Sequence, residues 1–290
     1  MLDKGISRRG MLGVGAVLAA GFAATGCGAT QNTSYAQARA SAAPGAAAGV
    51  RAAPVSAAPA AGPPSTVAAE YAGMRPQRWG VEMAGIMSTF PAAGKQMALT
   101  FDACGGPGNN DIDESLVNFL IAERIPATLF LNKRWIDANR ARAAQLAANP
   151  LFELANHGVA HKPLSVNGRE AYGIAGTRSA RDAADEVWAN HELLTTLTGT
   201  PPRFFRAGTA HYDDVAVSIV DELGETPVGF SINADFGATA SAAKVQSAMN
   251  AAAPGAISLA HMHRPHSGTA AGMIAALPQI RAMGFTFVHL

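Results

Sequence analysis

The chain has 290 residues, a formal net charge of +1 and 15% charged residues, fewer than the roughly 25% of an average globular protein. No basic stripe stands out, so we expect no nucleic-acid partner. The two cysteines are Cys27 and Cys104. If Cys27 is lipidated or removed, the exported domain has no intramolecular disulfide.

Residues 1–28 are typical of an export signal rather than of a folded element. A twin-arginine pattern, Ser-Arg-Arg-Gly-Met-Leu, is followed by an apolar run that is too short to span a bilayer. The run ends in Ala24-Thr-Gly-Cys27, which resembles a bacterial lipobox without its usual leucine. We expect twin-arginine export to the periplasm or cell envelope, with a lipid on Cys27 as the membrane anchor. A cleaved signal and a secreted protein are the alternative.

Residues 29–73 consist largely of alanine, proline, glycine and serine. Such a segment buries too little apolar surface to offset its ordering entropy, so the pattern predicts a disordered linker. A Pro-rich linker of this length would hold a domain away from a membrane surface. The remaining residues, 74–290, are long enough for one domain with a substantial core.

That domain alternates short apolar runs with longer amphipathic ones. Strands are predicted at residues 97–103, 127–132, 152–157, 204–207, 227–232, 256–262 and 285–290. Helices are predicted at residues 111–124, 138–148, 181–198, 213–223, 241–252 and 270–283. This alternation indicates parallel strands joined by crossover helices. About seven such units favour a closed or nearly closed α/β barrel over an open doubly wound sheet.

Polar side chains stand at or just after the ends of five predicted strands. They are Asp102, His157, Arg206, Asp235 and His261. In barrels of this class the chemistry lies at the carboxyl ends of the strands. The sequence therefore predicts that these five residues converge on one site.

His157 and His161 are four residues apart, a spacing that places two imidazoles on one face of a helical turn. Neutral imidazoles suit a borderline metal ion such as zinc. The pair alone is weak evidence, because surface histidines are common, and Pro163 limits the length of the turn. Asp102 could instead cap a helix, but the next predicted helix begins later, near Asp111.

A more specific pattern comes from the order of these residues along the chain. The pattern consists of Thr100-Phe-Asp102, His157-x3-His161, Arg206, Asp235 and Leu259-x-His261. It resembles the motifs of the polysaccharide deacetylase family, the carbohydrate esterases that include chitin and peptidoglycan N-acetylglucosamine deacetylases. The resemblance covers residues 95–290. It implies a distorted (β/α) barrel, a divalent metal, most often zinc, and hydrolysis of an N-acetyl or O-acetyl group on a glycan.

The resemblance also implies roles for individual residues. His157 and His161 take the positions of metal ligands, and Asp102 takes that of the general base that deprotonates the attacking water. Arg206 matches the arginine that holds the base. His261 matches the general acid, and Asp235 matches the carboxylate that raises the basicity of this histidine.

One position departs from the family pattern. Its first motif has two adjacent aspartates, of which the second binds the metal, and here the second is Ala103. Three replacements stay open: Asp102 moves onto the metal, Cys104 contributes a thiolate, or a residue from elsewhere completes the site. We favour Asp102, in which case Asp213 or Asp214 becomes the nearest candidate base. Cys104 is the alternative ligand.

The third motif departs as well, since the family's Arg-Pro-Pro-Tyr is replaced by Arg206-Ala-Gly-Thr-Ala-His-Tyr212. His211 and Tyr212 either line the pocket or open the following helix. Phe236 stands where a tryptophan is usual, and His263 and His266 are interpreted as loop histidines.

The resulting hypothesis is an exported, lipid-anchored, metal-dependent deacetylase of an N-acetylated polysaccharide. One alternative is an amidase or O-acetyl esterase that acts on a small substrate. Another is a catalytically altered, glycan-binding envelope lipoprotein, which the alanine at position 103 makes worth testing.

Overall fold

The computed structural model describes residues 63–290. The predicted export signal, residues 1–28, and most of the predicted linker lie outside the described residues. Pro64–Glu70 forms helix α1, and its buried side chains Val67 and Ala68 pack in a cluster with α5 and α6. This segment lies within the range expected to be linker, so the folded unit begins earlier than the composition predicted. Two apolar residues in the right register are enough to anchor it.

An eight-stranded parallel sheet forms the centre of the domain. Its strands are β2 (Gln96–Ala103), β3 (Ala127–Leu131), β4 (Phe152–Asn156), β5 (Phe204–Phe205), β7 (Thr226–Pro227), β8 (Ile232–Asn233), β9 (Ile257–His261) and β10 (Thr286–Val288). The paired strands run in the order β7-β5-β4-β3-β2-β9-β8, and β10 pairs with the start of β2. The two end strands, β7 and β8, are not paired with each other, so the curled sheet stays open as a half-barrel. The predicted distorted (β/α) barrel is confirmed.

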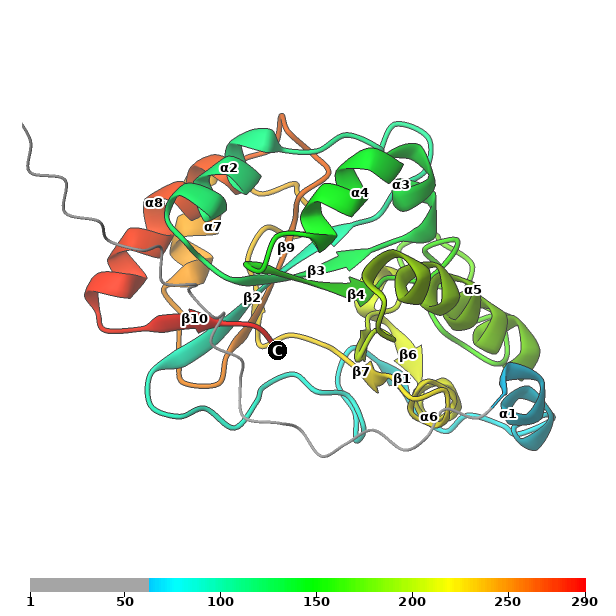
Figure 1. Ribbon diagram of the computed structural model, residues 1–290. Coiled ribbons are helices and arrows are strands. Elements are labelled where there is room, and N and C mark those ends of the chain that lie inside the picture. The colour runs from blue at the N-terminus through cyan, green and yellow to red at the C-terminus, as the bar shows by residue number, and fades with distance from the viewer. Residues whose placement is uncertain (1–62) are drawn as a thin grey trace, which may run out of the picture. The chain divides into compact units, whose positions relative to one another are not determined.

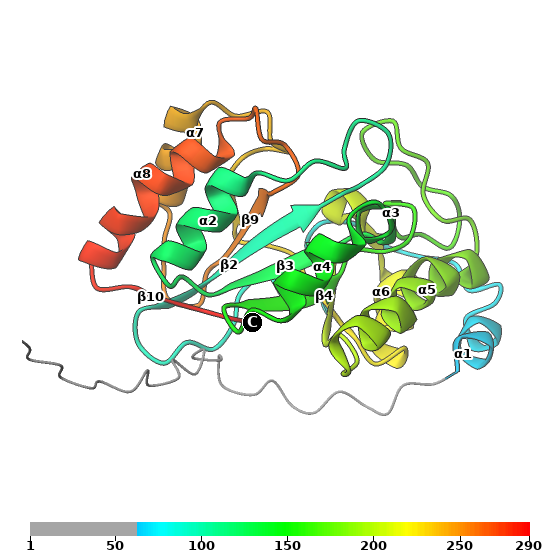
Figure 2. The same ribbon diagram turned by 45° about the horizontal axis from the view of Figure 1, so that its top comes forward.

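Helices cover the outside of the sheet. They are α2 (Glu114–Ala122), α3 (Lys133–Ala138), α4 (Arg140–Ala147), α5 (Ala180–Thr198), α6 (Asp214–Glu222), α7 (Ala242–Met249) and α8 (Thr269–Ala282). Figure 1 shows α2, α7 and α8 grouped beside β2 and β9, while α3, α4 and α5 cover β3 and β4. Figure 2 shows the arrows of β2 and β9 running in the same direction, as their parallel pairing requires.

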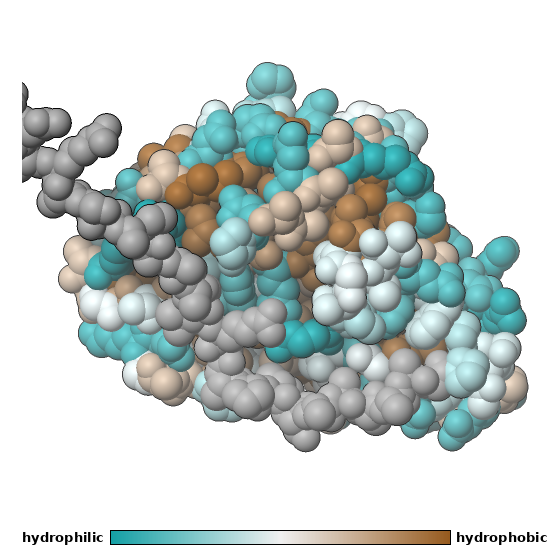
Figure 3. Space-filling view, in the orientation of Figure 1, coloured by the Kyte–Doolittle hydropathy of each residue, from teal (hydrophilic) through white to brown (hydrophobic). Residues whose placement is uncertain are grey.

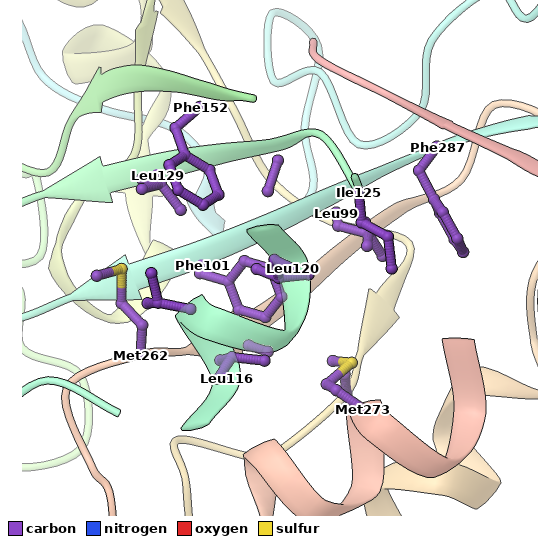
Figure 4. Close-up of a cluster of buried hydrophobic side chains, with 14 of the residues drawn as sticks. Leu99, Phe101, Leu116, Leu120, Ile125, Leu129, Phe152, Met262, Met273 and Phe287 are labelled. Carbon is purple, nitrogen blue, oxygen red and sulfur yellow. The ribbon is translucent and has the colours of Figure 1, made fainter. Parts of the chain in front are cut away.

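Alternation along β2 separates two cores. Its odd-numbered side chains, among them Leu99 and Phe101, face the helices and pack against Leu116 and Leu120 of α2 and Met273 of α8 (Figure 4). The next side chains along the strand, Thr100 and Asp102, face the inside of the half-barrel. In the view of Figure 3, hydrophobic side chains show over α2, α8 and α4 between hydrophilic ones.

The six predicted helices are present, but the predicted strand at 227–232 is two short strands, β7 and β8. Gly229 lies between them, and a Cβ there would come within 2.9 Å of side-chain atoms of Ser88 and Ile86. The chain must bend there to leave one strand position and enter another. A two-stranded antiparallel pair, β1 (Trp79–Gly80) with β6 (Tyr212–Asp213), lies apart from the main sheet.

Of the helices in the described part of the chain, none combines the length and apolar character needed to cross a membrane.

Candidate active site

Asp102 lies at the carboxyl end of β2 and is almost fully buried. Its Oδ1 accepts a hydrogen bond from Nη1 of Arg206 at 2.7 Å, and the same nitrogen donates to Oγ1 of Thr100 at 2.9 Å. Nη2 of Arg206 donates to the carbonyl of Gly229, and the guanidinium stacks over the ring of Phe130 at 4.1 Å. The buried guanidinium therefore fixes the carboxylate in one orientation.

His157 follows β4 and presents one ring nitrogen to the site. Its Nδ1 is hydrogen-bonded at 2.8 Å to the carbonyl oxygen of Arg206, so Nδ1 carries the proton and Nε2 has its lone pair free. Nε2 lies 3.6 Å from Oδ2 of Asp102. Burial lowers the pKa of His157 to about 3. The imidazole is therefore neutral at pH 7, the state in which it binds a metal.

His161 is placed by the turn that follows, and its backbone has a left-handed conformation with φ of 60°. The ring of His161 meets that of His157 edge-on, with centroids 4.9 Å apart. Burial and the neighbouring His157 lower its pKa well below its usual value. The carbonyl of His161 lies against Gly208, where a Cβ would come within 2.2 Å of that oxygen, so the turn requires glycine at position 208.

Cys104 is the first residue after β2, and its side chain returns to the face of Asp102 because side chains alternate along an extended chain. Its Sγ lies 3.8 Å from Nε2 of His157. Among the described residues, Cys104, His157 and His161 form a group whose ligand atoms lie within 4.8 Å of one another. One sulfur and two imidazole nitrogens are a donor set that zinc accepts. The residues present therefore fit a divalent metal of this type, and Asp102 lies outside that group.

Ala103 occupies the position where the family pattern has a second aspartate. Its side chain points to the other face of β2 and belongs to the cluster that packs under the helices. Its backbone pairs with Leu131 of β3. A carboxylate at this position would therefore lie in the apolar core.

His261 ends β9 beside Asp102, its register partner on β2, and Asp235 lies next to it. Oδ1 of Asp235 lies 2.8 Å from Nδ1 of His261, while Oδ2 accepts from the His261 backbone N–H and from Oγ1 of Thr269. Burial disfavours the imidazolium, but the hydrogen bonds to Asp235 and Cys104 outweigh it and raise the pKa of His261 well above its usual value. His261 thus carries a proton at pH 7 that it can donate.

Two carboxylates suggested by the sequence as alternative bases lie elsewhere. Asp213 caps α6 by accepting from the N–H of Ala216, and it also accepts from the N–H of Val166. Asp214 accepts from the backbone of Gln77 and Arg78. Neither lines the cavity of the site, so both are wrong as candidate bases. They follow Arg206 in the sequence because α6 begins there, with Asp213 as its cap.

Tyr212 is also structural. It is fully buried, and its hydroxyl accepts from the N–H of Ala207 and contacts the carbonyls of Phe205 and Val228. His211 remains partly exposed between Trp79 and Tyr172. Of these two residues, only His211 is partly exposed.

The sequence interpretation missed three residues of the site. His263 is buried, lines the cavity and contacts the His261 ring with centroids 5.5 Å apart. Arg134, three residues beyond the end of β3, donates from Nη2 to the carbonyl of Cys104 at 3.1 Å. Glu186 of α5 accepts from the backbone N–H groups of Ala160 and Lys162 and so holds the turn that carries His161. Arg134 and His263 both had a usable signal, their place after a strand end, and Glu186 had none.

These side chains surround a cavity of about 730 Å³. Asp102, Cys104, His161, His261 and Arg134 form part of its wall. Apolar side chains complete the rim, including Tyr172, Ile174 and Phe236. The mixture of a few convergent polar groups with an apolar rim is typical of a substrate pocket.

Fold and site together define a half-barrel α/β protein with the residue set of a hydrolase. Residues 91–228 match the family model of polysaccharide deacetylases. The chain therefore carries a polysaccharide deacetylase domain, as its motifs predicted, and the predicted enzyme class is confirmed at the level of this domain. A comparison with curated proteins found no match.

Solved structures share the fold. A family 4 carbohydrate esterase pseudoenzyme from Bacillus anthracis is 20% identical, with a TM-score of 0.58 over 69% of this chain and 65% of that one. A peptidoglycan N-acetylglucosamine deacetylase is 21% identical, with a TM-score of 0.58 over 70% and 89%. A family 4 acetyl xylan esterase from Clostridium thermocellum, in complex with cobalt, is 20% identical, with a TM-score of 0.55 over 67% and 88%. At these identities the likeness establishes the architecture.

Proposed function

We propose that the chain hydrolyses an acetyl group from an N-acetylated polysaccharide and that the reaction depends on a divalent metal, most simply zinc. One observation carries the proposal: Asp102 is held by Arg206 while Cys104, His157 and His161 gather three ligand atoms beside it. Base and ligands are thus separate residues. This arrangement favours Cys104, rather than Asp102, as the replacement for the missing acid.

The metal would be held by Sγ of Cys104 and the imidazole nitrogens of His157 and His161. When bound, it would supply Lewis acidity for the acetyl carbonyl and for the water that attacks it. The hydrogen bond from Nδ1 of His157 to the carbonyl of Arg206 fixes the ring orientation that this requires. Burial raises the pKa of the Cys104 thiol, so binding would release its proton.

The proton transfers are assigned to two residues that end neighbouring strands, Asp102 of β2 and His261 of β9. Asp102 accepts the proton of the attacking water, and Arg206 keeps the carboxylate aimed at the ligand cluster. His261 donates its proton to the leaving nitrogen as the carbon–nitrogen bond breaks, and Asp235 stabilises the imidazolium until then. The amide and water become acetate and a free amine.

Peptidoglycan is the substrate that best fits the proposed location, and a solved neighbour is a peptidoglycan N-acetylglucosamine deacetylase. An O-acetyl group on a glycan is the second candidate, because another neighbour is an acetyl xylan esterase. The same base and ligands serve an ester, which needs no proton on nitrogen. An ester-specific enzyme would therefore depend less on His261.

We also propose that the chain is exported by the twin-arginine route and anchored through a lipid on Cys27. The supporting observations are the arginine pair and the cysteine that ends the apolar run. Labelling of cells with a radioactive fatty acid tests this. Wild-type chain should be labelled in the membrane fraction, and the Cys27→Ser variant should be unlabelled; equal labelling of the two would contradict the anchor.

The activity is tested with purified full-length chain. We expect about one zinc ion per chain and acetate release from peptidoglycan or chito-oligosaccharides, both lost after chelation and restored by zinc. His157→Ala should lose both. Zinc binding with acetate released only from small esters would support the small-substrate alternative. Glycan binding without zinc and without acetate would support the altered, glycan-binding protein instead.

A further inference from the structure

Tyr172 is displayed on the tip of a tight turn at the rim of the cavity. Ala171 and Ile174 exchange backbone hydrogen bonds in both directions, at 3.1 and 2.9 Å, so Tyr172 and Gly173 form a two-residue turn. Both have positive φ, 53° and 74°. These values define the type of hairpin turn that favours asparagine or glycine at both positions.

A tyrosine at such a position needs an explanation. A left-handed backbone is uncommon for a bulky residue and costs on the order of 1 kcal/mol or more. The side chain gains little from packing in return, because it is 83% exposed. Phe236 repeats the combination at the same cavity, with φ of 53° and 57% exposure. Two exposed aromatic rings on strained backbone at one rim indicate a binding role.

Tyr172 is the first member of a row of rings beside the cavity. The Tyr172 ring contacts His211 edge-on at 5.3 Å, and His211 contacts Trp79 at 5.7 Å. The guanidinium of Arg169 lies over the Trp79 ring at 5.3 Å. His211 is fixed in turn by a 2.8 Å hydrogen bond between its Nδ1 and the carbonyl of Thr209, another residue of the cavity wall. The row is therefore anchored to the site rather than loosely attached.

We propose that Tyr172 is a glycan subsite, where a sugar ring next to the reacting residue of the same polymer stacks. The inference rests on the proposed function and adds that the substrate is an extended chain. A pyranose presents one face of C–H groups, and these pack on the negative face of an aromatic ring. The Tyr172 ring is open to solvent, so a sugar can reach it directly. It also lines the cavity, so the sugar that stacks on it can belong to the polymer bound there.

The test compares full-length wild type with Tyr172→Asn and Tyr172→Phe on N-acetylglucosamine oligomers of one to six sugars. Asparagine suits the left-handed turn, so this variant removes the ring and leaves the turn intact. We expect kcat/KM for the hexamer to fall about tenfold in Tyr172→Asn, as loss of one stacked ring predicts, and to stay within about twofold in Tyr172→Phe. The loss should be smaller on the monomer and on a small acetyl ester, which span fewer subsites than the hexamer.

Met283→Ala is the matched control, because Met283 is exposed but lies at the end of α8, outside the cavity lining. An equal loss on all substrates, or no loss on the hexamer, would overturn the subsite. Binding to insoluble chitin is measured in parallel. If wild type releases no acetate yet binds chitin through Tyr172, the proposed function fails and the subsite stands; if binding ignores Tyr172, the subsite fails as well.

Discussion

At the scale of single residues, the ligand question depends on which face of β2 each side chain occupies. Asp102 and Cys104 share the face of the cavity, while Ala103 lies between them on the face of the helices. The sequence comparison suggested a missing acid at position 103. In the structure the candidate ligand Cys104 lies one residue further along the chain, where the alternation returns to the cavity.

This geometry predicts that Ala103→Asp does not repair the site. The new carboxylate would be buried among apolar side chains such as Leu131 and Trp135, which we expect to destabilise the fold by on the order of 3 kcal/mol. Urea unfolding measures the change, and zinc analysis measures the ligand set. A stable Ala103→Asp variant with tighter zinc binding would show that position 103 faces the metal.

Asp102→Asn separates base from ligand. We expect this variant to keep its zinc, because the ligand group consists of Cys104, His157 and His161, and to lose about 10²–10⁴-fold in kcat, as loss of a general base predicts. Cys104→Ser is the reciprocal variant and should lose zinc. If instead Asp102→Asn loses zinc while Cys104→Ser keeps it, Asp102 is the ligand.

At the scale of elements, the apolar periods predicted six helices and most strands because each has a buried face long enough to leave a pattern. The six-residue helix α3 is too short to show an apolar period. It forms because Asn132 caps it by accepting from the N–H of Arg134. The antiparallel pair β1–β6 has two residues in each strand. Local patterns do not reveal such elements, because tertiary contacts create them.

Helix α5 illustrates how an element supports the site from behind. Its Glu186 accepts from Ala160 N–H with both carboxylate oxygens and from Lys162 N–H with one, and its backbone carbonyl accepts from Val159. Gly158 lies so close that a Cβ would come within 2.7 Å of Oε1 of Glu186. One buried side chain thus determines the path of the turn from His157 to His161.

Glu186→Gln should therefore weaken zinc binding by about tenfold, since an amide has one acceptor oxygen for three N–H contacts. Asp185→Asn is the matched control: it removes the neighbouring acid on the exposed face of α5, where Asp185 pairs with Arg181. Competition with a chromogenic chelator measures the zinc affinity. Unchanged affinity in Glu186→Gln, or the same loss in both variants, would refute the positioning role.

At the scale of the whole molecule, the half-barrel gathers residues that are far apart in sequence. Strand ends identified Asp102, His157, Arg206, Asp235 and His261 in advance, because parallel strands place their carboxyl ends together. His263 follows a strand end as well but was interpreted as a loop histidine, whereas Glu186 had no such signal. His263 reaches the site through the loop after β9, and Glu186 through the face that α5 happens to bury.

A buried polar network joins three parts of the fold behind the site. Oε1 of Glu225 lies 2.8 Å from both Nδ2 of Asn156 at the end of β4 and Nδ1 of His191 in α5. Asn156 also accepts from the Gly158 N–H and from Nδ2 of Asn190. In the described part of the chain, Oε2 of Glu225 has no hydrogen-bond partner. The charged form of Glu225 therefore destabilises the fold, because one of its buried oxygens has no hydrogen bond.

The network predicts how stability depends on pH. Burial raises the pKa of Glu225 from its ordinary 4.5 to about 7, so between these values the folded chain binds this proton more tightly than the unfolded chain does. The contribution is fully present below about pH 4.5 and is lost as pH rises through 7, and its size is on the order of 3 kcal/mol. Glu225→Gln, which stays neutral, should lack this loss. Urea unfolding of both proteins from pH 5 to 8 measures it, and parallel profiles would show that Glu225 does not titrate there.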